Sequence, residues 1–342
     1  MSSDVPCILV ITAGFSDKRD SVSPALVDQY NTEVLPGKVH HEGRKDRVLS
    51  RFGMGAVWRN LELLNQAILE RAGTFDILFV VKGNFVRAET LKMLKTLPNP
   101  PAVLGWTCDD MYLPHNNSAI FKAAAPYYDI FYTAKSLNIA RNELVQMGFR
   151  HVEFLHQGFD RDVHKPLKVS GSIFEDKVVF IGFGETDRFN KMNYLAKNGI
   201  EIHTWGNGWT NWMKMKAHKN LHIHGHPLLG AEYAEALSNA KISLCFLRKL
   251  NCDLHTARTF EIPACGGFML AERTDEHREY FTEDREAVYF DGEKELLDKV
   301  KKYMKDDEKR NAIAEAGYSR TRDSDYSYHR LTRDIIENIL SS

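Results

Sequence analysis

The chain has 342 residues, of which 43% are hydrophobic and 11% aromatic, and its formal net charge is −1. This length is more than one ordinary core needs and suits two domains, while the apolar content excludes an intrinsically disordered chain. The balanced charge also excludes the strongly basic composition that is typical of proteins that bind nucleic acid or anionic membranes.

The cysteines and the apolar runs favour a cytoplasmic protein. The five cysteines are an odd number without CxxC spacing, which is typical of reduced thiols. The N-terminus lacks the charged region and long apolar core of a signal peptide. No run approaches the roughly 18 apolar residues that span a bilayer, so we expect no integral membrane segment.

Apolar runs alternate with helical patterns in the N-terminal half, which predicts a parallel, doubly wound sheet. The predicted strands are residues 7–11, 76–81, 102–106, 130–133 and 152–155. The predicted helices are residues 58–71, 89–97 and 137–147. Residues 16–51 are polar and irregular, and we interpret them as a loop whose basic cluster is solvated.

Three residues at the ends of predicted strands are candidates for contacting an acceptor: Gly14, Lys82 and Asp110. Ligands of open α/β sheets bind beyond the carboxyl ends of the strands. The adjacent pair Asp109 and Asp110 could suggest a metal site. However, neighbouring residues of an extended chain point to opposite sides, and no further oxygen ligand lies nearby, so we expect no metal there. One aspartate is expected to cap a turn or a helix, and the other to face a cleft between the domains.

The C-terminal half repeats the alternation of strands and helices. The predicted strands are residues 177–182, 200–205, 242–247, 268–271 and 287–290, and the predicted helices are residues 233–240, 295–304, 308–317 and 328–340. Residues 167–172 have the composition of a linker. We therefore expect an N-terminal domain at 1–168, a C-terminal domain at 173–325 and a terminal segment at 326–342.

The turn after residue 181 is a candidate phosphate loop. Gly182 and Gly184 match the first two glycines of a dinucleotide fingerprint, but Asp187 stands in place of the third. Such a turn can expose amide donors at a helix N-terminus, with Arg188 and Lys191 supplying charge. An ordinary tight turn between a strand and a helix has the same pattern.

The segment 222–226 carries three histidines at alternate positions, His222, His224 and His226. Zinc could use this spacing, because imidazole is one of its preferred ligands. The segment itself offers neither a fourth ligand nor an acid. We therefore favour a half-exposed strand and expect no metal site.

The stretch 253–272, DLHTARTFEIPACGGFMLAE, combines charged residues, glycines and an apolar run. A helix that begins near Arg258 and breaks, or a short helix that opens near Pro263, is compatible with the proline. The Cys-Gly-Gly sequence at 265–267 is expected to end the helix. Glu261 would then lie at a helix end that faces the carboxyl edge of a sheet, where ligands bind.

A pair of cations, Arg248 and Lys249, precedes Asp253 in the sequence. Such cations suit the binding of a nucleotide diphosphate and its stabilisation as it departs. A cluster of surface salt bridges has the same pattern, so the spacing leaves both alternatives open.

Asp253 and Glu261 are separated by seven residues, and this pair resembles the Glu-x7-Glu signature of retaining glycosyltransferases, with aspartate at the first position. The sequences RTFEIPACGGFMLAERTDEHREYF and EAVYFDGEKELLDKVKKYM resemble the CgeB-like (spore maturation protein) glycosyltransferase family. The resemblance extends from about Asp76 to the end of the chain and is strongest at 258–281. It implies the GT-B fold, an α/β architecture in which two Rossmann-like, doubly wound domains face each other across a cleft. It also implies that the terminal helix packs across their junction.

The resemblance also implies the roles of the candidate residues. Asp253 and Arg258 are the expected catalytic residues. The expected donor-binding residues are Glu261, which would bind the ribose, and Arg248, Lys249, Gly182, Gly184, Arg188, Gly266 and Gly267. The implied activity is hexosyl transfer with retention, from a nucleotide-sugar substrate to a glycan, protein or small-molecule acceptor, without metal or cofactor. A nucleotide-sugar 2-epimerase and a non-catalytic nucleotide-sugar-binding module remain alternatives.

Overall fold

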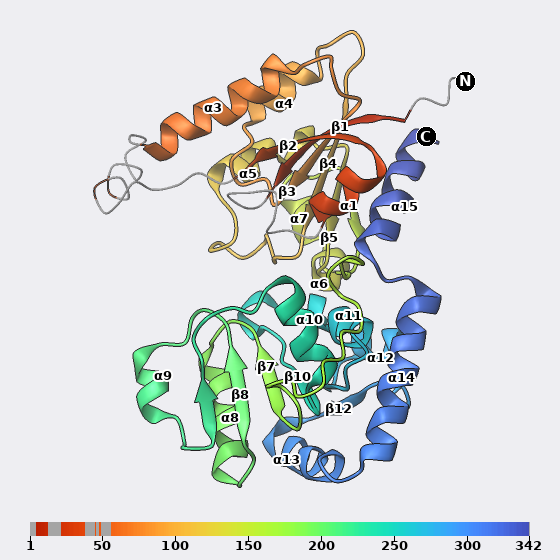
Figure 1. Ribbon diagram of the computed structural model, residues 1–342. Helices are drawn as coiled ribbons and strands as arrows, with labels where there is room; N and C mark the ends of the chain where they lie inside the picture. Colours follow the sequence, from red (N-terminus) through yellow and green to blue (C-terminus); the bar gives the residue numbers. More distant parts are fainter. Residues whose placement is uncertain (1–4, 13–21, 38–44, 46–47, 49–55, 342) are drawn as a thin grey trace. The chain divides into compact units, whose positions relative to one another are not determined.

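Two parallel six-stranded sheets form the framework of the chain, and helices flank each of them (Figure 1). The computed structural model describes residues 5–12, 22–37, 45, 48 and 56–341. Each sheet belongs to its own compact unit. The predicted α/β architecture with two doubly wound, Rossmann-like domains is therefore confirmed.

The first sheet has the strand order β2-β1-β3-β4-β5-β6. Its strands are β1 (Cys7–Thr12), β2 (Asn31–Pro36), β3 (Ile77–Val81), β4 (Ala102–Thr107), β5 (Ile130–Thr133) and β6 (Val152–Phe154). Its helices are α1 (Val22–Gln29), α3 (Ala56–Glu70), α4 (Ala88–Leu94), α5 (Ala119–Ala124), α6 (Ser136–Ala140) and α7 (Glu143–Gln146). The helix predicted at 137–147 is thus two short helices, because Asn142 takes a left-handed conformation with φ of 53°.

The prediction of a loop over residues 16–51 is wrong for residues 22–36, which form α1 and β2. Val22, Ala25 and Leu26 of α1 are buried, although their run is short. Strand β2 lies at the edge of the sheet, and its residues are exposed or only partly buried. A half-exposed edge strand lacks the continuous apolar run that identifies the central strands.

Helix α15 (Tyr328–Leu340) completes the first unit at the other end of the chain. Its buried residues, among them Leu331 and Ile335, share a core with the apolar face of α1. Tyr328 packs edge-on against Trp106 of β4, with ring centroids 5.9 Å apart. Residues from the end of the sequence therefore cover one face of the first sheet.

The second sheet has the strand order β12-β11-β10-β7-β8-β9. Its strands are β7 (Val178–Ile181), β8 (Ile202–Trp205), β9 (Leu221–Ile223), β10 (Ile242–Cys245), β11 (Met269–Glu272) and β12 (Val288–Phe290). Its helices are α8 (Thr186–Lys197), α9 (Asn211–Lys216), α10 (Gly230–Asn239), α11 (Ala257–Ala264), α12 (Asp275–Tyr280), α13 (Gly292–Tyr303) and α14 (Asp307–Ser324). The strands predicted in this half are all present, each within a few residues of its expected bounds.

The bounds of the two units differ from those of the predicted domains. The first unit contains the described residues up to Gln157, together with 250–252 and 328–341, and the second contains 158–249 and 253–327. The chain enters the second unit well before the expected linker at 167–172, because Phe159 is buried in the second unit's core. The amide of Leu167 also donates a hydrogen bond to Ser238 Oγ at 2.9 Å.

Within the described part of the chain, the helices are too short or too polar to cross a bilayer.

Candidate functional site

The strand order of the second sheet reverses between β7 and β10. The chain leaves β7 towards β8 on one side and leaves β10 towards β11 on the other. Ligands of open α/β sheets bind at such a switch point, beyond the carboxyl ends of the strands. Gly182 directly follows β7, and Arg248 and Asp253 lie in the segment after β10. The sheet therefore brings the predicted donor-binding residues to one edge.

Helix α11 follows this segment and carries two of the candidate residues. Its N-cap is Thr256, whose side chain accepts a hydrogen bond from the amide of Arg258 at 3.0 Å. The amide of Thr256 donates in turn to Thr259 Oγ1 at 3.0 Å, which completes a capping box. Of the two predicted alternatives, the helix that begins near Arg258 is the correct one, and Pro263 lies near its end. Glu261 lies inside this helix rather than at its end.

Two arginines converge on the ring of Phe180, in strand β7. The guanidinium carbon of Arg188 lies 5.5 Å from the ring centroid, and that of Arg258 lies 5.6 Å from it. Arg188 is buried and donates hydrogen bonds to the carbonyl oxygens of Phe183 at 3.0 Å and Phe246 at 3.3 Å. These carbonyls follow β7 and β10, so Arg188 connects the two sides of the switch point.

The hydrogen bonding of this arginine pair is incomplete. Among the described residues, the Nε atoms of Arg188 and Arg258 are buried without a hydrogen-bond partner. Burial, and then the neighbouring Arg258, lowers the pKa of Arg188 to about 10. The pKa of Arg258 is raised, because nearby groups such as Glu261 outweigh the effect of burial, so both guanidinium groups are cationic at neutral pH. Two buried like charges repel each other, and unpaired buried donors are costly. An anion with several oxygen acceptors would relieve both effects.

Glu261 lies between two aromatic side chains. The hydroxyl of Tyr233 donates to Glu261 Oε2 at 2.6 Å. Burial, and then the carboxylate, raises the pKa of Tyr233 well above its ordinary value, so the phenol stays protonated. Nε2 of His164 lies 3.7 Å from Glu261 Oε1, and Nδ1 accepts from the amide of Asp160 at 2.9 Å. One carboxylate oxygen is thus fixed by Tyr233, while the other has no close hydrogen bond from His164.

The cations that follow β10 already have carboxylate partners. Arg248 Nε lies 2.6 Å from Glu185 Oε1, and Lys249 Nζ lies 3.2 Å from Asp187 Oδ1. Lys191, a further candidate for diphosphate charge, is paired with Asp187 and with Glu272, the latter at 3.1 Å. A diphosphate would have to compete with these carboxylates, so Arg188 and Arg258 are better placed to hold one.

Asp253 has a structural contact of its own. Its Oδ2 accepts a hydrogen bond from the amide of Arg248 at 3.2 Å, and its own amide donates to the carbonyl of Arg248 at 3.3 Å. These bonds close the turn between β10 and α11. The contact of Asp253 with a donor sugar stays a prediction.

The four candidate glycines have structural roles in backbone hydrogen bonding, close packing or helix termination. The amides of Gly182 and Gly184 donate to the carbonyls of residues 205 and 207, so neither is free for a phosphate. A Cβ at Gly182 would lie 3.0 Å from Arg258 Nη2, so the glycine leaves room for that guanidinium. Gly266, with φ of 68°, ends α11, and a Cβ at Gly267 would lie 2.5 Å from the carbonyl oxygen of Leu237. Donor contacts for these glycines stay predictions.

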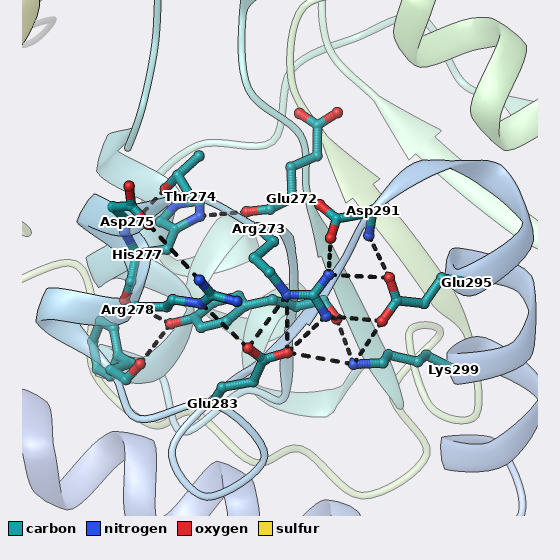
Figure 2. Close-up of polar contacts among 12 residues, drawn as sticks. Glu272, Arg273, Thr274, Asp275, His277, Arg278, Glu283, Asp291, Glu295 and Lys299 are labelled. Carbon is teal, nitrogen blue, oxygen red and sulfur yellow. Dashed lines mark hydrogen bonds and ion pairs between the residues drawn. The ribbon is translucent and has the colours of Figure 1, made fainter.

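A polar network braces the segment after β11 (Figure 2). Nδ1 of His277 donates to the carbonyl of Glu272 at 2.6 Å. Nε2 of the same ring lies 2.9 Å from the hydroxyl of Thr259 in α11. Burial lowers the pKa of His277 to about 4, so the ring is neutral at neutral pH. Arg273 forms ion pairs with three carboxylates, those of Glu283, Asp291 and Glu295. His277 therefore connects α12 to α11, and Arg273 connects the end of β11 to the start of α13.

The acceptor-side candidates of the first unit lie at the carboxyl ends of β3 and β4. Lys82 directly follows β3 with φ of 70°, and its Nζ lies 2.5 Å from Asp109 Oδ2. A cavity of about 170 Å³ lies beside it and is lined by Ile11, Thr12, Gly37, Val81, Lys82, Gly83, Asn84, Phe85 and Val86. The third candidate, Gly14, lies outside the described residues.

Asp110 is buried, and its carboxylate caps a turn. Its Oδ1 accepts from the amide of Tyr112 at 3.0 Å and from Asn138 Nδ2 at 2.9 Å. Its own amide donates to Asn251 Oδ1 at 2.9 Å. The prediction that one aspartate caps a turn is confirmed, but the partner of Lys82 is Asp109. Of the adjacent acids, Asp109 is therefore the better acceptor-side candidate.

Replacing Asp110 by alanine is expected to lower the free energy of unfolding by about 2 kcal/mol, because the buried Nδ2 of Asn138 and the partly buried amide of Tyr112 would each lose an acceptor. The matched variant Asp109→Ala is expected to cost less than about 1 kcal/mol, because its ion pair with Lys82 is partly exposed. Urea denaturation followed by tryptophan fluorescence would compare the two. Equal losses would contradict the structural role of Asp110.

Tyr233, His164, Glu185 and Asp187 complete the surroundings of the donor-site candidates, and none of them was predicted to do so. Tyr233 reaches Glu261 from α10, and His164 reaches it from the segment that enters the second unit. No spacing within the sequence connects these residues. Glu185 and Asp187 directly follow the glycine turn in the sequence. Their negative charge was a signal that cations near this turn, such as Arg248 and Lys249, could be paired with carboxylates.

Comparisons with known proteins agree with this architecture. Residues 189–337, less than half of the chain, match the family described as glycosyl transferase-like. A glycosyltransferase from Rickettsia africae is similar at 12% identity, with a TM-score of 0.64 and coverage of 98% of both chains. HepE of Anabaena in complex with UDP-glucose has 11% identity and a TM-score of 0.63, covering 98% of this chain and 100% of its own. A Listeria monocytogenes protein, provisionally assigned as a UDP-N-acetylglucosamine 2-epimerase, has 12% identity and a TM-score of 0.59, covering 99% of this chain and 96% of its own.

The two Rossmann-like units together have the GT-B fold of glycosyltransferases, as the resemblance implied. Identities this low show the fold alone. No curated protein sequence matches the chain significantly. The CgeB-like assignment stays a prediction.

Proposed function

We propose that the chain is a glycosyltransferase that moves a sugar from a nucleotide-sugar donor to an acceptor. The observation that carries this proposal is the arginine pair at the switch point, whose buried Nε atoms lack partners among the described residues. Glu261 lies in the same helix as one of these arginines. The family match over 189–337 and the UDP-glucose bound by the structurally similar HepE support the proposal.

Arg258 and Arg188 would supply the positive charge that the reaction needs. As the bond between the sugar and the diphosphate breaks, negative charge grows on the departing oxygen, and nearby guanidinium groups stabilise it. Because the arginines provide this charge, we propose that transfer needs neither a divalent metal at the donor site nor a resident cofactor. Glu261 would bind the ribose hydroxyls, and Asp253 would face the sugar. Hexosyl transfer with retention is proposed from the resemblance.

The first unit would hold the acceptor. The cavity beside Lys82 opens at the carboxyl ends of β1 and β3, where α/β sheets bind ligands. Lys82 and Asp109 offer a donor and an acceptor of hydrogen bonds there. Such a pair suits the hydroxyl groups of a sugar or a small polar acceptor.

A nucleotide-sugar 2-epimerase is the second candidate, because the Listeria protein assigned to that activity has a similar fold. An epimerase of this kind would release a free sugar and would need no acceptor. The two functions therefore differ in their products.

Incubation of the protein with UDP-glucose and with UDP-N-acetylglucosamine, in the presence of EDTA, tests the proposal. We expect each bound donor to raise the Tm and release UDP, with the sugar found on a supplied glycan, protein or small-molecule acceptor. A free sugar epimerised at C2 would identify the epimerase. Donors that raise the Tm but never release UDP would instead identify a binding module.

A further inference from the structure

Four polar side chains gather on strands β8 and β9 and on the residues that flank them, at the edge of the second sheet. His203 of β8 stands opposite His222 of β9 in the parallel register. Alternate residues of a strand share a face, so Glu201 lies on the same side as His203, and His224 on the same side as His222. The spacing of the histidines at 222–226 does not predict this cluster, because Glu201 and His203 come from the neighbouring segment of the chain.

Three of these side chains point their ligand atoms at one another. Nε2 of His203 lies 3.0 Å from Glu201 Oε1, and Nε2 of His222 lies 3.4 Å from the same oxygen. All three atoms lie within 4.8 Å of one another. A tetrahedral zinc ion with bonds of about 2.0–2.1 Å separates its ligand atoms by about 3.3 Å. The cluster therefore needs little rearrangement to surround a metal.

His224 is placed to orient His203. Its Nε2 lies 3.1 Å from Nδ1 of His203, and its ring stacks on Trp205 with centroids 4.3 Å apart. A histidine that binds a metal through Nε2 carries its proton on Nδ1 and donates it to an acceptor. The neutral Nε2 of His224 is such an acceptor, so a metal ion would fix both tautomers.

We propose that Glu201, His203 and His222 bind a divalent transition-metal ion, with zinc as the best match. Two imidazoles and one carboxylate form a ligand set that suits zinc, whereas magnesium and calcium prefer oxygen alone. Water would complete the coordination, because Glu201 and His222 are partly exposed. The ion would link the edge strand β9 to its neighbour β8. His224 would be a positioning residue, because it orients His203. This site uses none of the residues proposed to hold the donor.

The test uses the full chain, freed of any histidine tag and stripped of metal with EDTA. Zn²⁺ binding is measured by calorimetry, and Co²⁺ binding by visible absorption. The variants Glu201→Ala and His222→Ala each remove a partly exposed ligand, so both are expected to fold. His226→Ala is the matched control, because this exposed histidine lies on the same segment outside the cluster, with its ring centroid 6.4 Å from that of His224.

The parent and His226→Ala are expected to bind one equivalent of Zn²⁺ that both ligand variants lose. His224→Ala is expected to weaken binding by about 10- to 100-fold, as is typical for partners of metal ligands. The Co²⁺ spectrum should lack a thiolate charge-transfer band. Equal stoichiometry and affinity in the parent and both ligand variants would overturn the proposal, as would a thiolate band that the variants leave unchanged.

Discussion

Replacing Arg258 by glutamine is expected to lower kcat/KM for sugar transfer by about 100- to 1000-fold, the usual cost of removing one group that stabilises developing negative charge. Arg258 lies beside Gly182 at the end of β7, and its Nε has no partner among the described residues. The variant should still fold, because it removes a cation that disfavours the charged form of the buried Arg188. Steady-state kinetics with UDP-glucose as donor, together with the Tm, would measure both effects.

Comparing the affinities of the Arg258 variant for UDP and for uridine would show whether Arg258 contacts the diphosphate. If Arg258 holds the diphosphate, its variant loses affinity for UDP and keeps its affinity for uridine. Arg248→Gln is the matched control, because Arg248 is already paired with Glu185, and we expect less than a 10-fold loss from it. An Arg258 variant that folds and keeps the parent's UDP affinity would remove this residue from the donor site.

Replacing Glu261 by alanine is expected to weaken UDP binding by about 10- to 100-fold, because a hydrogen bond to a charged group contributes about 1.5–3 kcal/mol. The carboxylate is held by Tyr233 and would accept hydrogen bonds from the ribose hydroxyls. Calorimetric titration with UDP would measure the loss. A 2′,3′-dideoxy analogue of UDP provides the sharper comparison, since it lacks both hydroxyls.

The parent and Glu261→Ala should bind the dideoxy analogue with the same low affinity. The substitution should therefore weaken the binding of UDP but not that of the analogue. Tyr233→Phe keeps the carboxylate but removes its fixed orientation, so we expect an intermediate loss. If the substitution of Glu261 weakened the binding of UDP and of the analogue equally, the residue would act through folding. If the variant bound UDP with the parent's affinity, Glu261 would take no part in binding.

The central strands were predictable because parallel strands buried on both faces consist of continuous apolar runs. Strands β3, β7 and β10 show this pattern, whereas the half-exposed β2 does not, and its polar composition led to the prediction of a loop. The boundary between the units was misplaced for a related reason. The sequence at 167–172 has the composition of a linker, but the contact of Leu167 with Ser238 and the burial of Phe159 in the second core depend on tertiary packing.

The candidate site was predictable where its residues follow one another in the sequence. The spacing of Asp253 and Glu261 pointed to this stretch, and the family resemblance implied Arg258, which lies in the same helix as Glu261. Tyr233 and His164 reach Glu261 from other elements, so only the fold brings them together. Asp109 and Asp110 show a second limit: which of two adjacent acids turns inward depends on the geometry of a single turn.

The first unit is assembled from three separate stretches of the chain, and this arrangement constrains how its gene can evolve. The amide of Asp110 relies on Asn251, and the apolar face of α1 relies on α15. A gene segment that ended after Gln157 would encode neither partner. Exchanging the first unit as a block between related genes would require all three stretches to move together, which takes four crossovers. A single crossover after Gln157 would therefore separate most of the first unit from two stretches that complete it.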